Sequence, residues 1–198
     1  MDCVCPRVYL AGVFQPQWFS SMSLEGVVLM KRILMAAMVI VLAASLGAGL
    51  VSAKPTTYRT HLSGDEEVPP RDTHATGQAN FWLNSDGTEL TFMLIVANIE
   101  NVVASHIHIG APGVNGGVVA FLYPTMPPGG GPINGIIATG TITDDSLIGT
   151  LAGQPLSALI DAIEAGNAYV NVHTNDGIAP IDTGPGDFPG GEVRGQID

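Results

Sequence analysis

The sequence predicts an all-β protein over residues 54–198, an antiparallel Greek-key sandwich or barrel of about eight strands with one short helix. The chain contains 25 glycines and 14 prolines among its 198 residues, which is typical of a protein with many turns. Short runs of β-branched and aromatic residues alternate with these turn residues. Only one segment has the apolar spacing of a helix. Many short strands and a single helix favour an antiparallel architecture.

The clearest strand pair is a hairpin. Residues 77–83 alternate strictly, with Ala79, Phe81 and Leu83 on one face. The turn sequence Asn-Ser-Asp-Gly follows at 84–87 and leads into the next strand. The Pro- and Gly-rich residues 124–135 are predicted to form a loop. The complete set of predicted strands is 56–62, 77–83, 88–99, 103–109, 118–123, 136–142, 168–174 and 192–197.

The predicted helix covers about residues 155–165. Its apolar residues follow the i, i+3, i+4, i+7 spacing of one helical face, at Leu156, Leu159, Ile160 and Ile163. Pro155 suits the first turn of a helix, and Gly166 suits the position just past its end. We expect this helix to close one end of the sheets or to cover a sheet edge.

The N-terminal part of the chain reads as a targeting segment. Lys31 and Arg32 precede the uncharged residues 33–53, which end in Val-Ser-Ala. This pattern predicts a secretory signal peptide over residues 30–53, cleaved after Ala53, and hence a secreted, periplasmic or cell-surface protein. The alternative is an uncleaved anchor, because a helix of that length, at ~1.5 Å per residue, just spans a bilayer core. Residues 1–29 are predicted to be a mis-called upstream start or a non-structured extension.

Charge and cysteine content exclude several classes of function. The whole chain has a formal charge of −11, and residues 54–198 keep 4 basic against 16 acidic side chains. Such a charge excludes nucleic acid as a partner, because nucleic-acid binding requires clustered Lys and Arg. Both cysteines lie at positions 3 and 5, so the mature chain has neither disulfides nor thiolate chemistry, and no membrane span is expected in it.

Several separated segments resemble the chordin (CHRD) domain family. In chain order they are LSGDEEVPP (62–70), ATGQA (75–79), SHIHIG (105–110), YVNVHT (169–174) and PGGEVRGQ (189–196). The resemblance extends over residues 57–197. It implies an extracytoplasmic domain, and the leading interpretation is a non-enzymatic binding or structural module that acts through its loops. Its partner would be an extracytoplasmic protein or a surface ligand.

A fainter resemblance concerns chemistry. The pattern His106-x-His108, His173 and Arg194 is similar to the copper half of Cu,Zn superoxide dismutase. This resemblance implies that the three histidines bind copper and that Arg194 guides an anion to the metal. The alternative function is therefore a copper-binding redox protein with a superoxide dismutase-like reaction. No other histidine lies between His108 and His173, so the resemblance does not extend to a zinc site.

Strand alternation supports the same three histidines independently. Residues two apart in a strand share a face, so His106 and His108 present their imidazoles side by side. Neutral imidazole is a ligand for Cu, Zn and Ni. On the later strand, His173 shares its face with Tyr169 and Asn171. The alternative is that the histidines hydrogen-bond to loop backbones; His61 and His74 are expected on the surface, with His74 at most a fourth ligand.

The charged residues near the C-terminus have a structural alternative as well. Arg194 is expected to pair with an acid such as Glu192, Asp187 or Glu67. The acidic cluster of this region has the oxygen-rich setting that Ca²⁺ prefers but lacks the spacing of an EF-hand loop, so a solvated acidic loop is expected at Asp176, Asp182, Asp187 and Glu192. No hydrolase or nucleotide-binding motif is present.

Overall fold

The computed structural model describes residues 56–198. The predicted extension over 1–29, the signal peptide over 30–53 and its cleavage after Ala53 lie outside the described residues. Within residues 56–198 the α-helix has nine residues, and no helix there has the length and hydropathy needed to cross a bilayer.

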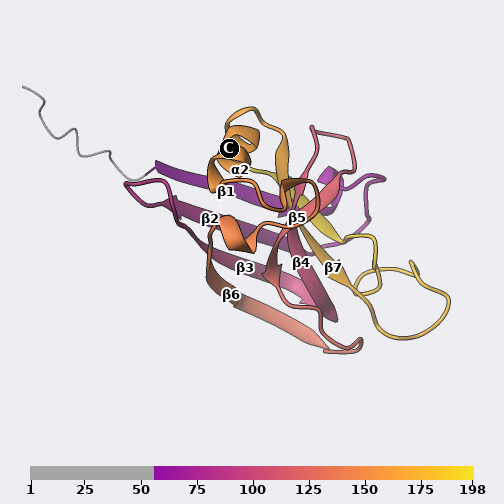
Figure 1. Cartoon of the computed structure of the whole chain (residues 1–198). Helices are drawn as coiled ribbons and strands as arrows, with labels where there is room; N and C mark the ends of the chain where they lie inside the picture. The colour runs from indigo at the N-terminus through magenta and orange to yellow at the C-terminus, as the bar shows by residue number, and fades with distance from the viewer. Residues whose placement is uncertain (1–55) are drawn as a thin grey trace, which may run out of the picture. The chain divides into compact units, whose positions relative to one another are not determined.

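Eight antiparallel strands form one sheet, as predicted. They are β1 (Thr56–Ser63), β2 (Thr76–Leu83), β3 (Leu90–Glu100), β4 (Val102–Ile109), β5 (Gly117–Tyr123), β6 (Pro132–Ile142), β7 (Ala168–Thr174) and β8 (Val193–Gln196). Their order in the sheet is β5-β4-β7-β8-β1-β2-β3-β6. The two edge strands, β5 and β6, contact each other, so the sheet nearly closes into a barrel (Figure 1).

Alternating side chains fill the barrel interior. In the predicted hairpin, Ala79 and Phe81 of β2 are fully buried, whereas Trp82 faces outward. β2 pairs with β3 in unbroken register from Thr76 opposite Ala97 to Leu83 opposite Leu90. The inward residues of β3 follow the same period of two, so each strand of the hairpin contributes one face to the apolar core.

The chain changes sides of the barrel at a single residue. Asn101 alone separates β3 from β4, two strands that do not pair with each other. Its φ of 54° is left-handed, a conformation that asparagine tolerates better than most residues. Its side chain donates to Gly186 O (3.2 Å) and accepts from Gly131 N–H (2.9 Å). Asn101 therefore ties the corner of the barrel to two long loops.

The predicted helix is α2 (Leu156–Glu164), and its four expected apolar residues are all buried. It starts after Pro155, and Gly166 follows it with a φ of 69°, as the terminal signals predict. A further cap comes from Asp144 in the short 3-10 helix η3 (Asp144–Ser146), which accepts the Leu156 N–H at 2.7 Å. At the end of the helix, Glu164 accepts the hydroxyl proton of Tyr58 on β1 at 2.9 Å.

The predicted loop over 124–135 is too long by four residues. The structure begins β6 at Pro132, and residues 132–135 pair with the end of β3. Proline is tolerated as the first residue of an edge strand because its missing N–H is not needed there. The pairing of β3 with β6 shifts register twice, at Leu94/Ile95 and at Val96/Ile99. The second shift falls between Gly135 and Ile133, at the start of β6.

Truncation in the core is expected to lower stability sharply. Leu94 is fully buried on β3, so Leu94→Ala should reduce the free energy of unfolding by about 2–5 kcal/mol, through lost burial and a residual cavity. The matched control is Ile136→Thr on β6, where the native side chain is 60% exposed. Urea unfolding of both variants should show a change below about 0.5 kcal/mol for the control. Equal losses in the two variants would contradict the described core.

Candidate functional site

The site lies on the outside of the barrel, under three loops. On β7, Val170 and Val172 point into the core, so Tyr169, Asn171 and His173 point outward. Although they face away from the core, Tyr169 and Asn171 are buried, because residues 64–75, 110–116 and 175–192 fold over this face. Figure 1 shows these loops gathered around β4 and β7.

His106, His108 and His173 come together on this covered face. Strand β4 pairs with β7, which places His106 opposite Asn171. His173 lies two residues further along β7, on the same face of that strand. The nearest nitrogens, His106 Nδ1 and His173 Nε2, are 3.1 Å apart, and one ligand atom from each ring lies within 4.8 Å of the other two. Two donors that share one ion at 2.0–2.1 Å are about 3–4 Å apart, so the pair His106 Nδ1 and His173 Nε2 has this spacing, whereas the widest separation in the cluster, up to 4.8 Å, exceeds it.

Loop carbonyls set the orientation of two of the rings. His108 Nδ1 lies 3.0 Å from Gly116 O, and His173 Nδ1 lies 2.9 Å from Pro189 O. Because a carbonyl can only accept, each Nδ1 carries the proton and the lone pair of each ring lies on Nε2. His108 Nε2 is buried and has no hydrogen-bond partner. Carbonyls that accept the outer N–H of the ring in this way are typical of histidines that ligate metals.

The three rings are kept neutral by their surroundings. Burial, together with the neighbouring His173 and His108, lowers the pKa of His106 to about 4. Burial also lowers the pKa of His108 and of His173, although their carbonyl hydrogen bonds act in the opposite direction. All three imidazoles are therefore in the ligating form at neutral pH.

One side of the cluster is open. Phe121 on β5 packs edge-on against His106, with ring centroids 4.7 Å apart, and is 48% exposed. His106 and His173 are half-buried, whereas His108 is 8% exposed and lies deepest. His106 and His173 therefore keep part of their surface in contact with solvent.

Arg194 is placed differently from the expectation. Its side chain is 1% exposed and donates to Ala111 O (3.1 Å), Val114 O (3.1 Å) and Asn115 Oδ1 (3.3 Å). The expected ion pair with Glu192, Asp187 or Glu67 is wrong. Within residues 56–198 the ion pair that forms joins Arg71 to Asp182 at 3.4 Å. Anion guidance by Arg194 stays a prediction, and this burial does not favour it.

A buried carboxyl group, which the sequence offered only as a partner for Arg194, is hydrogen-bonded to the outward face of β7. Glu67 accepts from Asn171 Nδ2 with both oxygens, at 3.0 and 3.3 Å. Burial raises the pKa of Glu67 to about 7, although the charges of Arg194 and Arg71 act to lower it. Gly191 packs so closely here that a Cβ would lie 2.4 Å from Asn171 Nδ2 and 2.6 Å from Glu67 Oε1.

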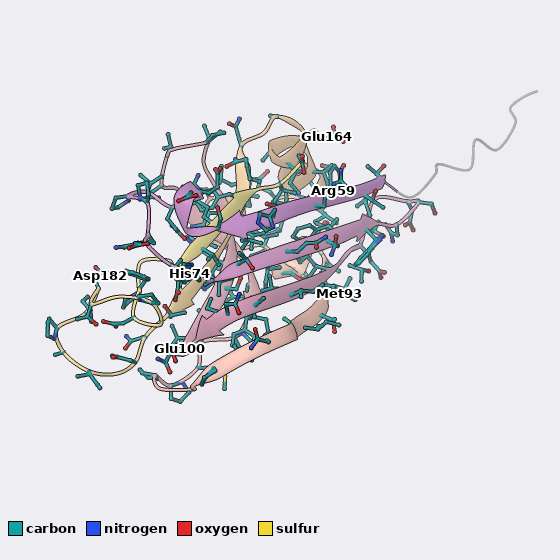
Figure 2. All side chains as sticks on the ribbon, turned by 180° about the vertical axis from the view of Figure 1, so that it is seen from behind. Arg59, His74, Met93, Glu100, Glu164 and Asp182 are labelled. Carbon is teal, nitrogen blue, oxygen red and sulfur yellow. The ribbon has the colours of Figure 1, made fainter. Side chains whose placement is uncertain are left out.

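The expected solvated acidic loop is wrong for two of its four residues, Asp187 and Glu192, which are buried. Glu192 is fully buried and accepts from Thr73, Thr174 and the Gly186 N–H, while Asp187 accepts from Thr183. Asp182, in the outer part of this loop, pairs with Arg71 (Figure 2). Within residues 56–198 the histidine cluster is the one group of His, Cys, Asp and Glu close enough to share a metal, and the exposed His61 and His74 do not belong to it.

The residues that sequence reasoning missed are those buried by loops. Tyr169 and Asn171 were placed on the face of His173, but their burial and contacts with the covering loops were not predicted. Glu67 was named only as a partner for Arg194, and its burial against Asn171 was not predicted. The one available signal for their burial is the alternation of β7. Its two valines face the core, so the polar row on the other face needs a cover of its own if it is to be buried.

Residues 58–197 match the family of the CHRD domain. The match covers most of the chain, so the chain belongs to the CHRD domain family, as the resemblance of its motifs implies. Membership supports an extracytoplasmic setting. No curated protein and no solved structure was found to match the chain.

The buried titrating groups predict a pH dependence with two opposing parts. Between pH 6.5 and about 4 the unfolded chain binds more protons at His106 than the folded chain, so acidification lowers the free energy of unfolding. Glu67 acts oppositely between pH 4.5 and about 7, where the folded chain binds the extra proton. We expect Glu67→Gln to make the loss of stability on acidification steeper than in wild-type protein, as measured by urea unfolding from pH 7 to pH 4.5.

The control for this measurement is the exposed neighbour Glu66. Glu66→Gln makes the same substitution at an exposed position of the same loop. It should leave the pH dependence of the free energy of unfolding as steep as in wild-type protein. A slope that is no steeper in Glu67→Gln than in wild-type protein would show that Glu67 does not titrate as a buried group.

Proposed function

We propose that this protein is an exported copper-binding domain in which His106, His108 and His173 hold the metal. The observation that carries this proposal is the unpartnered Nε2 of His108. A buried polar atom without a partner costs about 1–3 kcal/mol of folding free energy. One ligand nitrogen of His108 lies within 4.8 Å of one from His106 and one from His173. A metal ion is the partner that would satisfy all three nitrogens at once.

The donor set favours copper among the metals of the extracytoplasmic space. Three neutral imidazoles with neither thiolate nor carboxylate suit Cu, Zn and Ni, and Cu²⁺ binds most tightly to a given nitrogen site. The resemblance of the His-x-His and late-strand histidine pattern to the copper half of Cu,Zn superoxide dismutase points to the same metal. Copper would supply one-electron redox chemistry, and a superoxide dismutase-like reaction is the reaction we would assay.

The chain's own residues would prepare the site before metal binds. Gly116 O and Pro189 O hold the protons of His108 and His173 on Nδ1, away from the metal position. His106 Nδ1 faces His173 Nε2 at 3.1 Å, and because His173 carries its proton on Nδ1, its Nε2 accepts the proton of His106 Nδ1. A metal held at His106 Nδ1 would require that ring to carry its proton on Nε2 instead.

A second candidate function is a binding module that acts through its loops, without metal. The carbonyl hydrogen bonds of His108 and His173 would then serve to hold the loops in place. Exposed apolar side chains on two of these loops, at Val114, Ile178 and Ile181, favour a protein or surface ligand as partner. The acidic charge of the chain again argues against nucleic acid.

Elemental analysis of untagged protein loaded with Cu²⁺ and desalted discriminates between the two functions. We expect about one copper per chain in wild-type protein and a loss of at least tenfold in occupancy in His106→Ala/His108→Ala, because two of three ligands are removed. Competition with Zn²⁺ in the same experiment measures the expected preference for copper.

The matched control is His61→Ala/His74→Ala, which removes two histidines that are exposed and outside the cluster. It should retain the copper of the wild-type protein. Equal copper in all three proteins would mean adventitious binding, and none in wild-type protein would leave the loop-binding module as the function.

A further inference from the structure

Behind the histidine cluster, three side chains from three neighbouring strands form a stacked column. Arg194 of β8 lies over the ring of Tyr169 on β7, with Cζ 3.4 Å from the ring centroid. Tyr169 in turn stacks on His108 of β4, with centroids 4.8 Å apart and planes 11° apart. The column runs from a guanidinium charge directly to the deepest of the three proposed ligands.

The charge at the base of this column is buried and is not paired with an acid. The three acceptors of Arg194 are two carbonyls and an amide oxygen, all from residues 110–116. Glu67, whose carboxyl group is within electrostatic reach of Arg194, is hydrogen-bonded to Asn171 instead. A cation held in this way keeps its field, because a buried charge is screened much less by water and salt than an exposed one.

The column also fixes the plane of the His108 ring. The Tyr169 hydroxyl accepts the Gly116 N–H at 3.0 Å, and the Gly116 carbonyl accepts the His108 Nδ1 proton. Gly116 has no room for a side chain, since a Cβ would overlap Ile109 O. One group of contacts, among Arg194, Tyr169 and Gly116, thus sets the plane of the His108 ring, its tautomer and the position of the nearby charge.

We infer that Arg194 is a positioning residue that raises the reduction potential of copper held by His106, His108 and His173. The inference rests on the proposed function. A fixed positive charge beside the site disfavours Cu²⁺ more than Cu⁺, since the first carries the larger charge. Charges and stacked groups outside the ligand set are recognised means by which a protein tunes a metal. Arg194 in this role touches neither the metal nor a substrate.

The test is a redox titration of the copper-loaded full chain, monitored by the Cu²⁺ EPR signal. The titrant donates one electron, which reduces bound Cu²⁺ to Cu⁺. Arg194→Gln should lower the potential by an amount corresponding to about tenfold in the ratio of Cu⁺ to Cu²⁺ affinity, which is about 59 mV for one electron. Arg194→Lys keeps the charge but loses the planar donors, and should stay closer to wild-type protein.

The control is Arg59→Gln. Arg59 is exposed on β1, away from the loop of Asp182 that closes the site (Figure 2), so removing its charge should leave the potential unchanged. Should Arg194→Gln not fold, Arg194→citrulline, made by ligation of a synthetic C-terminal peptide, keeps the planar donors and removes only the charge.

The outcomes separate this inference from the proposed function. A wild-type protein that binds no copper overturns the proposed function and this inference with it. Full copper occupancy with the same potential in wild-type protein and in the neutral variant overturns the role of Arg194 alone. Equal shifts in Arg194→Lys and Arg194→Gln would mean that lost hydrogen bonds to residues 110–116, and not lost charge, move the potential, and would also overturn it.

Discussion

The structure depends on a polar layer that is buried on the outside of the barrel. The outward faces of β4, β7 and β8 carry histidines, Asn171 and Arg194, and burying such groups is costly unless each finds a partner. Glu192 is the group that keeps the cover closed. Its carboxylate is fully buried and accepts from Thr73, Thr174 and Gly186, so one side chain joins β7 to two of the three covering loops.

The order of the histidine site follows from that cover. The carbonyl of Pro189 stands three residues before Glu192, and it orients His173 because the loop cannot move away. Arg194 plays the same part for the loop over residues 110–116, which supplies the Gly116 carbonyl to His108. Asn101 attaches the outer ends of two long connections to the corner between β3 and β4. The ligand atoms are thus arranged by groups that are not themselves ligands.

The charges buried near the histidines include a cation as well as carboxyl groups. Residues 54–198 are strongly acidic, yet the guanidinium of Arg194 is buried here and hydrogen-bonded to three acceptors. Backbone carbonyls rather than carboxylates satisfy Arg194, since the loop over residues 110–116 turns its carbonyls inward. The carboxyl group of Glu67 responds to the same burial in the opposite sense, with a raised pKa. Within the described part of the chain, Arg194, Glu67 and Glu192 are therefore each held by hydrogen bonds and not by ion pairs.

The sequence by itself determined the eight strands, the helix after Pro155 and the face shared by Tyr169, Asn171 and His173, because periodicity and turn residues act within a few positions. It also identified the three histidines, through a spacing of two and a family resemblance. Tertiary structure alone decided that His106 meets His173, 67 residues away, since that contact requires β4 and β7 to be neighbours in the sheet. The partners of Arg194, the burial of Glu67 and the extension of β6 to Pro132 were decided in the same way. Each depends on strand order and loop packing between segments distant in the chain, which no local pattern encodes.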